Sequence, residues 1–255
     1  MVIHLFMKKS YILILLLFNC CVYSQEKKID SLKNLLRQHA KEDTIKAGIY
    51  KNISSSYRLT NPDLGLLYAD SCLSIANKLK SNKLLFNSYQ LFGINYVFKA
   101  ENEKALAMYK KGYVVALQSK DKYMQATNLH TTAYIYSISG KNREALALET
   151  KSYKLMMELG KISEAIAALN SVGSNYFYLA DYKEANKYYF KALKLAEKIN
   201  DKKHIATAYE NIALIYKRIE NSKKSEFYYQ KSLSIYKQLN DISGLINVYT
   251  NYGAL

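Results

Sequence analysis

The sequence predicts an all-α protein, a right-handed superhelical solenoid of antiparallel helix pairs, because small residues recur every forty positions and apolar residues keep a helical spacing. The repeated small residues are Gly93, Ala133, Gly173, Ala213 and Gly253. A tyrosine follows three positions later in most copies, at Tyr96, Tyr136, Tyr176 and Tyr216. Two more small sets recur, Ala105, Ala145, Ala185 and Ser225, and then Gly112, Ser152, Ala192 and Ser232. Paired helices approach closely only at small side chains, so each repeat is expected to hold two helices.

Apolar spacing supports both helices in the copy at residues 162–201. Leu169 and Val172 lie three apart in its first half, and Ala185 and Tyr189 lie four apart in its second half. The residues expected to break the helices are Ala180 with Asp181 inside this copy, and Gly160, Asn200 and Asn240 between copies.

These boundaries predict a chain of successive helix pairs behind a distinct N-terminus. The expected segments are 1–24, a signal peptide; 25–43, an amphipathic helix; 44–82, a degenerate repeat; 83–121, 122–161, 162–201 and 202–241, four further repeats; and 242–255, a partial, truncated repeat.

The repeated residues resemble the tetratricopeptide repeat family, whose first helix carries an aromatic residue, a large apolar residue, Gly or Ala, and Tyr. The copy at 202–241 shows the pattern at Tyr209, Ile212, Ala213 and Tyr216, followed by Ser225, Tyr229 and Ser232. The resemblance covers residues 44–255 and implies stacked helix hairpins of a bacterial, secreted type.

Two features depart from the family pattern. Pro62 is the only proline in the chain, so the proline that usually closes each copy is missing. The period is forty residues where about thirty-four is usual, which predicts longer helices. The copy at 44–82 is the most degenerate, and we expect local irregularity there. Cys72 stands at its third small position and is expected to be a buried packing residue.

The N-terminus has the pattern of a secretory signal peptide. Lys8 and Lys9 precede an apolar run at 11–18, and cleavage is expected after Ser24. The run is shorter than the roughly twenty residues that span a bilayer. We therefore expect an exported protein, periplasmic or associated with the cell envelope. A start at Met7 is an alternative to Met1.

A lipoprotein is the alternative interpretation of this N-terminus. Cys20 or Cys21 would then carry the lipid, but Phe18 and Asn19 do not fit the small residues that usually precede such a cysteine.

The formal net charge of +16 raises nucleic acid as a partner, because phosphate contacts scale with basic residues. Export argues against it, and no interleaving of aromatic residues with arginine indicates base stacking. We expect no nucleic-acid partner within this chain. Most lysines are expected on solvated helix faces, with weak contact to an anionic surface as the alternative.

No pattern in the sequence indicates catalysis. His39, His130 and His204 are not within metal-ligand spacing of another histidine or cysteine. There is no glycine-rich phosphate loop and no serine nucleophile elbow. We expect a protein without enzymatic activity, cofactor or metal. A lone histidine at position 130 is expected to be a contact or a bystander in the groove.

By resemblance, the first helices of the repeats line a concave groove that binds a peptide or protein. The residues expected to line it are Lys51, Arg58, Gln90, Ile94, Val97, His130, Tyr134, Asn170, Ser174, Phe177, Tyr178, Glu210 and Lys217. An apolar strip is expected at Ile94, Val97, Tyr134 and Phe177. Basic residues at its ends suit a segment with acidic flanks. The alternative is that these aromatic residues pack between helices.

The sequence therefore predicts a noncatalytic scaffold that binds proteins or peptides in the bacterial envelope. The partial copy ending at Leu255 suggests an alternative, the sensory region of a membrane histidine kinase or helix-turn-helix regulator whose effector lies beyond this residue. A third, weaker alternative is an envelope enzyme or its accessory subunit. The sequence does not indicate the oligomeric state.

Overall fold

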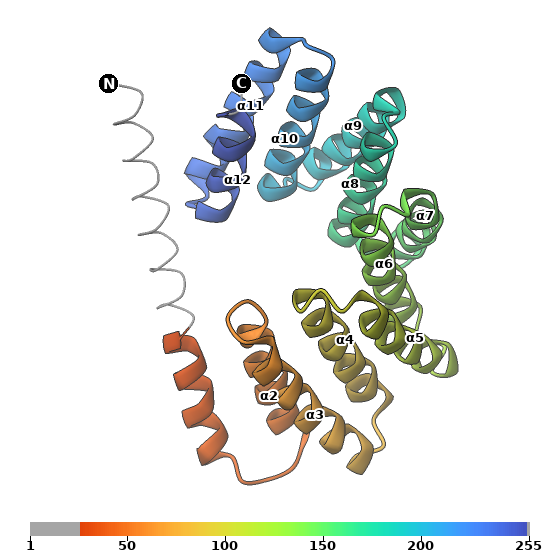
Figure 1. The fold of residues 1–255 in the computed structure, drawn as a ribbon, viewed down its shortest axis with the longest axis vertical. Helices are drawn as coiled ribbons and strands as arrows, with labels where there is room; N and C mark the ends of the chain where they lie inside the picture. Colours follow the sequence, from red (N-terminus) through yellow and green to blue (C-terminus); the bar gives the residue numbers. More distant parts are fainter. Residues whose placement is uncertain (1–25, 254–255) are drawn as a thin grey trace. The chain divides into compact units, whose positions relative to one another are not determined.

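A computed structural model describes residues 26–253 of the chain. The expected signal peptide, its cleavage site and the two candidate lipidation cysteines lie outside the described residues. The chain divides after Ser119 into two compact units. Each unit consists of antiparallel helices joined by short connections (Figure 1).

The first unit contains a helix at residues 26–38, followed by α2 (Thr44–Tyr57), α3 (Pro62–Lys78), α4 (Asn82–Phe98) and α5 (Asn102–Gln118). From α2 onward each helix packs on the next, and α2 also contacts α4. The helix at 26–38 lies against the end of α2, where the ammonium group of Lys33 is 5.4 Å from the centre of the Tyr57 ring.

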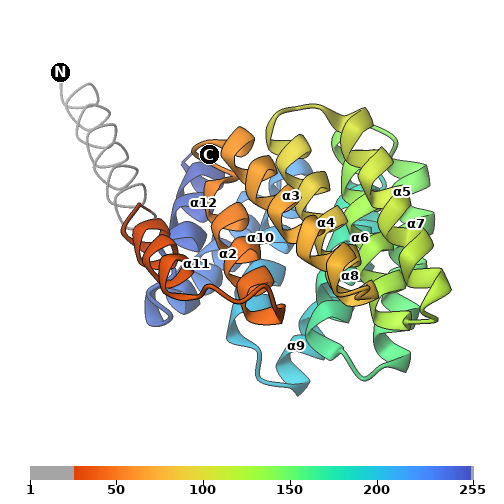
Figure 2. The same cartoon turned by 90° about the horizontal axis from the view of Figure 1, so that it is seen from below.

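The second unit contains α6 (Lys122–Ile138), α7 (Asn142–Glu158), α8 (Ile162–Tyr178), α9 (Tyr182–Lys198), α10 (Lys202–Arg218), α11 (Ser222–Gln238) and α12 (Ile242–Tyr252). Each helix packs on the next, and contacts also join α6 to α8, α8 to α10 and α10 to α12 (Figure 2). The first helices of successive pairs therefore lie side by side within this unit.

The predicted all-α class is confirmed, since residues 26–253 contain helices and turns but no strand. From α4 to α11 every helix has 17 residues. Two such helices with their three-residue connections fill the forty-residue period, which explains why the period is longer than usual.

The first helix pair is irregular, as expected for the degenerate copy. Its first helix, α2, has only 14 residues. Ser54 donates a 2.7 Å hydrogen bond to the carbonyl oxygen of Gly65, and the side-chain amide of Asn95 donates to Ser54 Oγ at 3.1 Å. The Asn95 amide fills the space that a Cβ at Gly65 would need. A buried polar contact thus replaces apolar packing in this pair.

The small residues face large rings in the partner helix. A Cβ on Gly173 would lie 2.5 Å from Cε1 of Tyr189, and Gly93 is covered in the same way by Tyr109. Substituting either glycine would push α8 from α9 or α4 from α5, so the repeated small residue sets how closely each pair packs.

The third small position joins the two helices of the same pair. The hydroxyls of Ser152 and Ser232 each donate a 2.9 Å hydrogen bond to a backbone carbonyl oxygen, that of Ala126 and that of Ala206. Cys72 occupies the same position, is almost fully buried, and has its Sγ 3.7 Å from the Ala47 carbonyl oxygen. The prediction that Cys72 is a packing residue is therefore confirmed.

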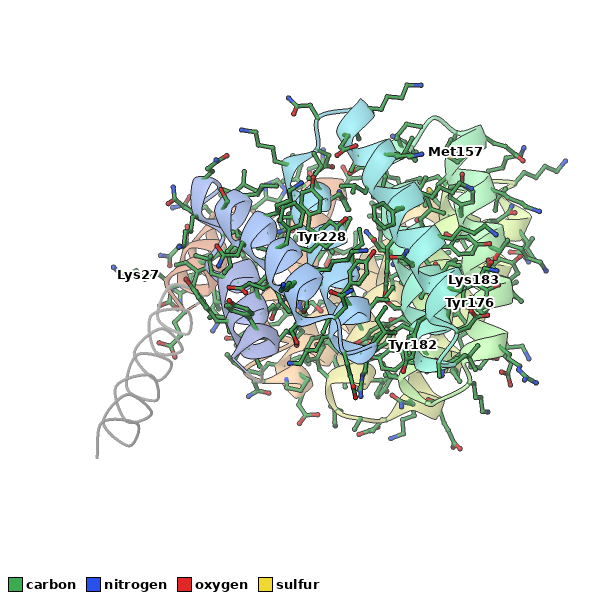
Figure 3. All side chains as sticks on the ribbon, turned by 90° about the horizontal axis from the view of Figure 1, so that it is seen from above. Lys27, Met157, Tyr176, Tyr182, Lys183 and Tyr228 are labelled. Carbon is green, nitrogen blue, oxygen red and sulfur yellow. The ribbon has the colours of Figure 1, made fainter. Side chains whose placement is uncertain are left out.

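The repeated tyrosine belongs to the packing between paired helices. Tyr176 stacks on Tyr188 with ring centres 5.4 Å apart, and Tyr216 stacks on Tyr228 at 5.6 Å. Figure 3 labels one ring of each pair, Tyr176 and Tyr228. Stacking of two aromatic rings stabilises the packing beyond what the burial of their apolar surface contributes. These tyrosines recur because they hold the two helices of a pair together.

A left-handed residue ends each of the regular helices. The residues with positive φ recur every twenty positions: Lys80, Ala100, Lys120, Gly140, Gly160, Ala180, Asn200, Glu220 and Asn240. After Ala180, the amide of Asp181 donates to the carbonyl oxygen of Tyr176 at 3.0 Å, and the Asp181 carboxylate accepts from the amide of Glu184 at 3.1 Å. One turn therefore caps both the helix that ends and the helix that starts.

None of the described helices is both long enough and apolar enough to cross a membrane.

Replacing Ala180 by glycine should stabilise the protein. Ala180 has a φ of +60°, which costs an L-residue about 1–2 kcal/mol, while the freedom of glycine in the unfolded chain costs about 0.4–1 kcal/mol. We expect Ala180→Gly to raise the free energy of unfolding in urea by about 1 kcal/mol. The control is Gly160→Ala, at a φ of +66°, which should lower it. A less stable Ala180→Gly variant would contradict this explanation of the turns.

Adding one methyl group at Gly173 should destabilise the protein by about 1–3 kcal/mol, because it overpacks the contact with Tyr189. The control is Gly48→Ala in α2, where an added Cβ meets no atom within 4 Å. That variant should gain about 0.5–1 kcal/mol from helix propensity. Thermal or urea unfolding of both variants measures the difference, and stabilisation of both would disprove the close-contact role of Gly173.

Candidate functional site

The expected groove residues of the first unit lie on α2 and α4 and at the end of α2. Gln90, Ile94 and Val97 are partly buried along α4. Lys51 lines a hollow of about 400 Å³. Arg58 caps α2, with its guanidinium carbon 5.8 Å from the centre of the Phe98 ring.

Three of the expected residues in the second unit come together at one place. Tyr134 on α6 and Ser174 and Tyr178 on α8 line the same pocket of about 270 Å³. Its lining residues are Tyr134, Ser137, Ile138, Glu149, Ser171, Ser174, Asn175 and Tyr178. Tyr134 and Tyr178 are 49% and 68% exposed, so the mouth of the pocket is aromatic.

The other expected residues of this unit take different roles. Phe177 packs on Tyr182 with ring centres 5.5 Å apart, and the guanidinium carbon of Arg218 lies 5.7 Å from the Phe177 ring centre. Lys217 donates a 2.7 Å hydrogen bond to the carbonyl oxygen of Asn251, whose amide donates to Glu210 at 2.9 Å. Phe177 is therefore interhelix packing, and Lys217 and Glu210 tie α10 to α12.

The expected apolar strip is divided between the two units. Ile94 and Val97 belong to the first unit, while Tyr134 and Phe177 belong to the second. Of the latter two, only Tyr134 lines the pocket.

Glu149 on α7 forms the wall of the pocket and was missed by reasoning from the sequence. It is 1% exposed and stands sixteen residues after Ala133, where the three other regular copies have Tyr109, Tyr189 and Tyr229 and the degenerate copy has Ala69. Those three tyrosines are buried against the small residue of their own pair. The missing ring leaves space between α6 and α8. The break in the tyrosine pattern was the signal that could have identified this residue.

His130 on α6 pairs with Glu149. Its Nδ1 lies 2.9 Å from Oε2 of the carboxylate, and the imidazole is 38% exposed. Burial raises the pKa of Glu149, and its hydrogen bonds from His130 and Ser171 offset this only in part. Burial lowers the pKa of His130, but the hydrogen bond and charge of Glu149 outweigh it, so the pKa is raised. Both pKa values are therefore above their ordinary values, so the pair keeps a proton at higher pH than either side chain would alone.

Two buried asparagines on α8 have side-chain atoms without a hydrogen-bond partner. Asn175 lines the pocket and is 2% exposed; its Nδ2 donates to the Ser171 carbonyl oxygen at 2.8 Å, but its Oδ1 accepts no hydrogen bond. Both amide atoms of Asn170, an expected groove residue, are also unpartnered, and Asn170 is buried. A buried polar atom without a partner costs about 1–3 kcal/mol. The pocket therefore offers an unused acceptor.

A second histidine cluster lies at the start of α10. His204 Nδ1 is 2.8 Å from Asp201 Oδ2, which also accepts from Ser163 Oγ at 2.9 Å. A catalytic triad uses the two ring nitrogens separately, one for serine and one for the carboxylate. Here Nδ1 faces both partners, with Ser163 Oγ at 3.4 Å, so the cluster caps the helix.

Within residues 26–253 no group of three His, Cys, Asp or Glu side chains is arranged to hold a metal ion.

Comparison with known proteins identifies the repeats directly. The tetratricopeptide repeat family model matches residues 164–238, which include most of α8 and all of α9, α10 and α11. Among curated protein sequences, none matches this chain.

Several solved structures share the fold. BtubC (BKLC) from P. vanneervenii has a TM-score of 0.67 at 16% identity, covering 86% of this chain and 91% of its own. A Rap protein complexed with Competence and Sporulation Factor has a TM-score of 0.66 at 17% identity, covering 90% and 71%.

A third similar structure is a signal transduction ATPase with numerous domains from Pyrococcus horikoshii, which has a tetratricopeptide repeat sensor. Its TM-score is 0.69 at 18% identity, and the match covers 91% of this chain and 38% of that protein. At such identities these structures show a shared fold and nothing finer. Residues 164–238 therefore match the tetratricopeptide repeat family, and the described helix pairs share the fold of these solved structures.

Proposed function

We propose that this protein is a noncatalytic scaffold of the bacterial cell envelope that binds a peptide or protein segment along the first helices of its repeats. The observation that carries the proposal is the pocket between α6 and α8, with exposed Tyr134 and Tyr178 at its mouth and the unpartnered Asn175 oxygen in its wall. Exposed aromatic side chains around a partly polar hollow are typical of recognition surfaces.

Known proteins of this fold support a binding role. The Rap protein was solved in complex with the Competence and Sporulation Factor. The net charge of +16, or +14 once residues 1–24 with Lys8 and Lys9 are removed, favours a segment with acidic flanks, because opposite charge speeds association. A location outside the cytoplasm is supported by the signal-peptide pattern of residues 1–24.

The alternative is a sensory region of a signalling protein. It is favoured by the likeness to the ATPase with a tetratricopeptide repeat sensor, of which the match covers 38%. In that case the segment bound by the repeats would be the signal, and the output would come from a different part of a longer protein.

Peptides selected on the purified protein from a random library should lose affinity when the pocket mouth is removed. We expect the double variant Tyr134→Ala with Tyr178→Ala to bind at least about 10-fold more weakly, because truncating an aromatic anchor often costs more than about 1 kcal/mol. Fluorescence polarisation measures the affinity. The control is Phe227→Ala on α11, an equally exposed aromatic residue outside the pocket. Equal effects of both changes, with helicity unchanged, would overturn the proposed site.

The proposed location has its own test. We expect native protein captured from cell fractions to begin at Gln25 and to have an intact mass that matches residues 25–255. Recovery from the periplasmic or envelope fraction would support export. Recovery of the uncleaved chain from the cytoplasm would refute it, and a larger membrane-bound species would favour the sensory alternative.

A further inference from the structure

We propose that the pocket between α6 and α8 binds one positively charged side chain, a lysine or arginine of the bound segment, with Glu149 as its counter-charge. The inference rests on the proposed function, because it assumes that the bound segment passes this pocket. It adds the chemical identity of the group that the segment places there.

The lining of the pocket favours a hydrogen-bond donor. No lysine, arginine or histidine is among the residues that line it. Glu149 supplies a carboxylate, and Asn175 supplies an amide oxygen that accepts no hydrogen bond within the protein. The hydroxyls of Ser137 and Ser174 can accept as well as donate. An ammonium or guanidinium group, which only donates, satisfies these acceptors, whereas an anion would face the buried carboxylate.

The aromatic mouth also suits a cation. Tyr134 and Tyr178 both line the pocket and expose much of their surface. Cations are attracted to the faces of such rings. Elsewhere in this unit the ammonium group of Lys191 lies 4.6 Å from the centre of the Tyr153 ring, so tyrosine faces in this protein already hold basic groups. The tyrosines would cover the stem of the side chain while Glu149 meets its charge.

The volume limits the occupant to one side chain. The pocket has about 270 Å³, which is below the roughly 300–1,000 Å³ of pockets that enclose drug-sized ligands. A lysine or arginine side chain can enter such a space while its backbone stays at the mouth. A whole folded partner would therefore contact the pocket through a single residue.

The His130–Glu149 pair links this binding to protons. The titratable groups that face the pocket or its carboxylate are His130 and Tyr134 on α6, Glu149 on α7 and Tyr178 on α8. In the empty pocket, a proton on His130 balances Glu149. An entering cation takes over that role, so binding displaces the proton. Affinity for a cation should therefore rise as pH increases through the raised pKa of His130, and affinity for an anion would change in the opposite direction.

The overall charge adds a second condition on the segment. The strongly positive net charge repels a uniformly basic partner, while the pocket selects a basic group at short range. The two effects are compatible when a single basic residue is flanked by acidic ones. We therefore expect selected peptides to share one lysine or arginine within an acidic context.

The direct test uses small probes on the purified protein. N-acetylarginine amide carries the guanidinium group, N-acetylcitrulline amide has nearly the same shape without the charge, and N-acetylglutamate amide is the anionic probe. We expect NMR titrations to show binding of the arginine probe at least 10-fold tighter than that of either other probe. We also expect its affinity to increase between pH 6 and pH 8.

Three variants identify the residue responsible. Glu149→Gln keeps the shape and removes the charge, and it should lower the affinity for the arginine probe at least 10-fold and abolish the pH dependence. Glu149→Tyr introduces the tyrosine that the other regular copies have at this position, and its ring should fill the pocket. The small residue that would face this ring is Ala133. In another pair Tyr229 packs with Ala213, so an alanine at this position accommodates the ring. Glu144→Gln, at an exposed position on α7, is the control for net charge.

The outcomes separate the pocket from the scaffold function. Equal binding of the arginine and citrulline probes, tighter binding of the anionic probe, or equal losses in Glu144→Gln and Glu149→Gln would overturn the proposal. Selected peptides that bind through Tyr134 and Tyr178 but share no basic residue would leave the scaffold function standing and refute the charged pocket. Binding of the arginine probe at Glu149 without any selected peptide would support the pocket and refute the peptide scaffold.

Discussion

The close contact between a small residue on one helix and a large ring on its partner is the constraint on which this protein depends. Gly173 beneath Tyr189 shows it most clearly, since a single added carbon would lie 2.5 Å from the ring. The contact fixes the distance between the two helices of a pair. Helix distance in turn fixes where the next pair can pack, so one spacing in the sequence is repeated through each unit.

The candidate site arises where this contact is altered. In the pair of α6 and α7, Glu149 replaces the tyrosine, and the carboxylate is too small to fill the space of a ring. His130 satisfies one of its oxygens, and the remaining space becomes a pocket. The repeated helix pairs therefore hold the helices in place, and one residue that departs from the repeat supplies the buried carboxylate.

The cost of this arrangement is visible in its polar groups. Glu149 has a raised pKa because it is buried. Oδ1 of Asn175 accepts no hydrogen bond, as is also true of Oδ1 of Asn95 at the matching position of α4, so only the carboxylate is particular to this pair. Stable cores rarely retain such groups without a function. The neighbouring pair of α8 and α9, in which Tyr189 is in place and bonds Ser174 at 3.1 Å, has no such carboxylate.

The sequence by itself determined the all-α class and the repeated helix pairs, because both depend on spacings that recur along the chain. Gly93, Gly173 and their tyrosines could be identified from periodicity alone. Side-chain environments were harder to predict: Phe177 is partly buried and packs against the interhelix core, although its spacing resembles that of Tyr134.

Only the tertiary structure decided which polar residues meet. His130, Glu149 and Asn175 come from three different helices, and no local pattern relates them. Their distances depend on how α7 packs between α6 and α8, and their protonation depends on how far that packing excludes water. The sequence therefore determined the repeated helix pairs, while burial and contacts between helices decided where those pairs form a charged pocket.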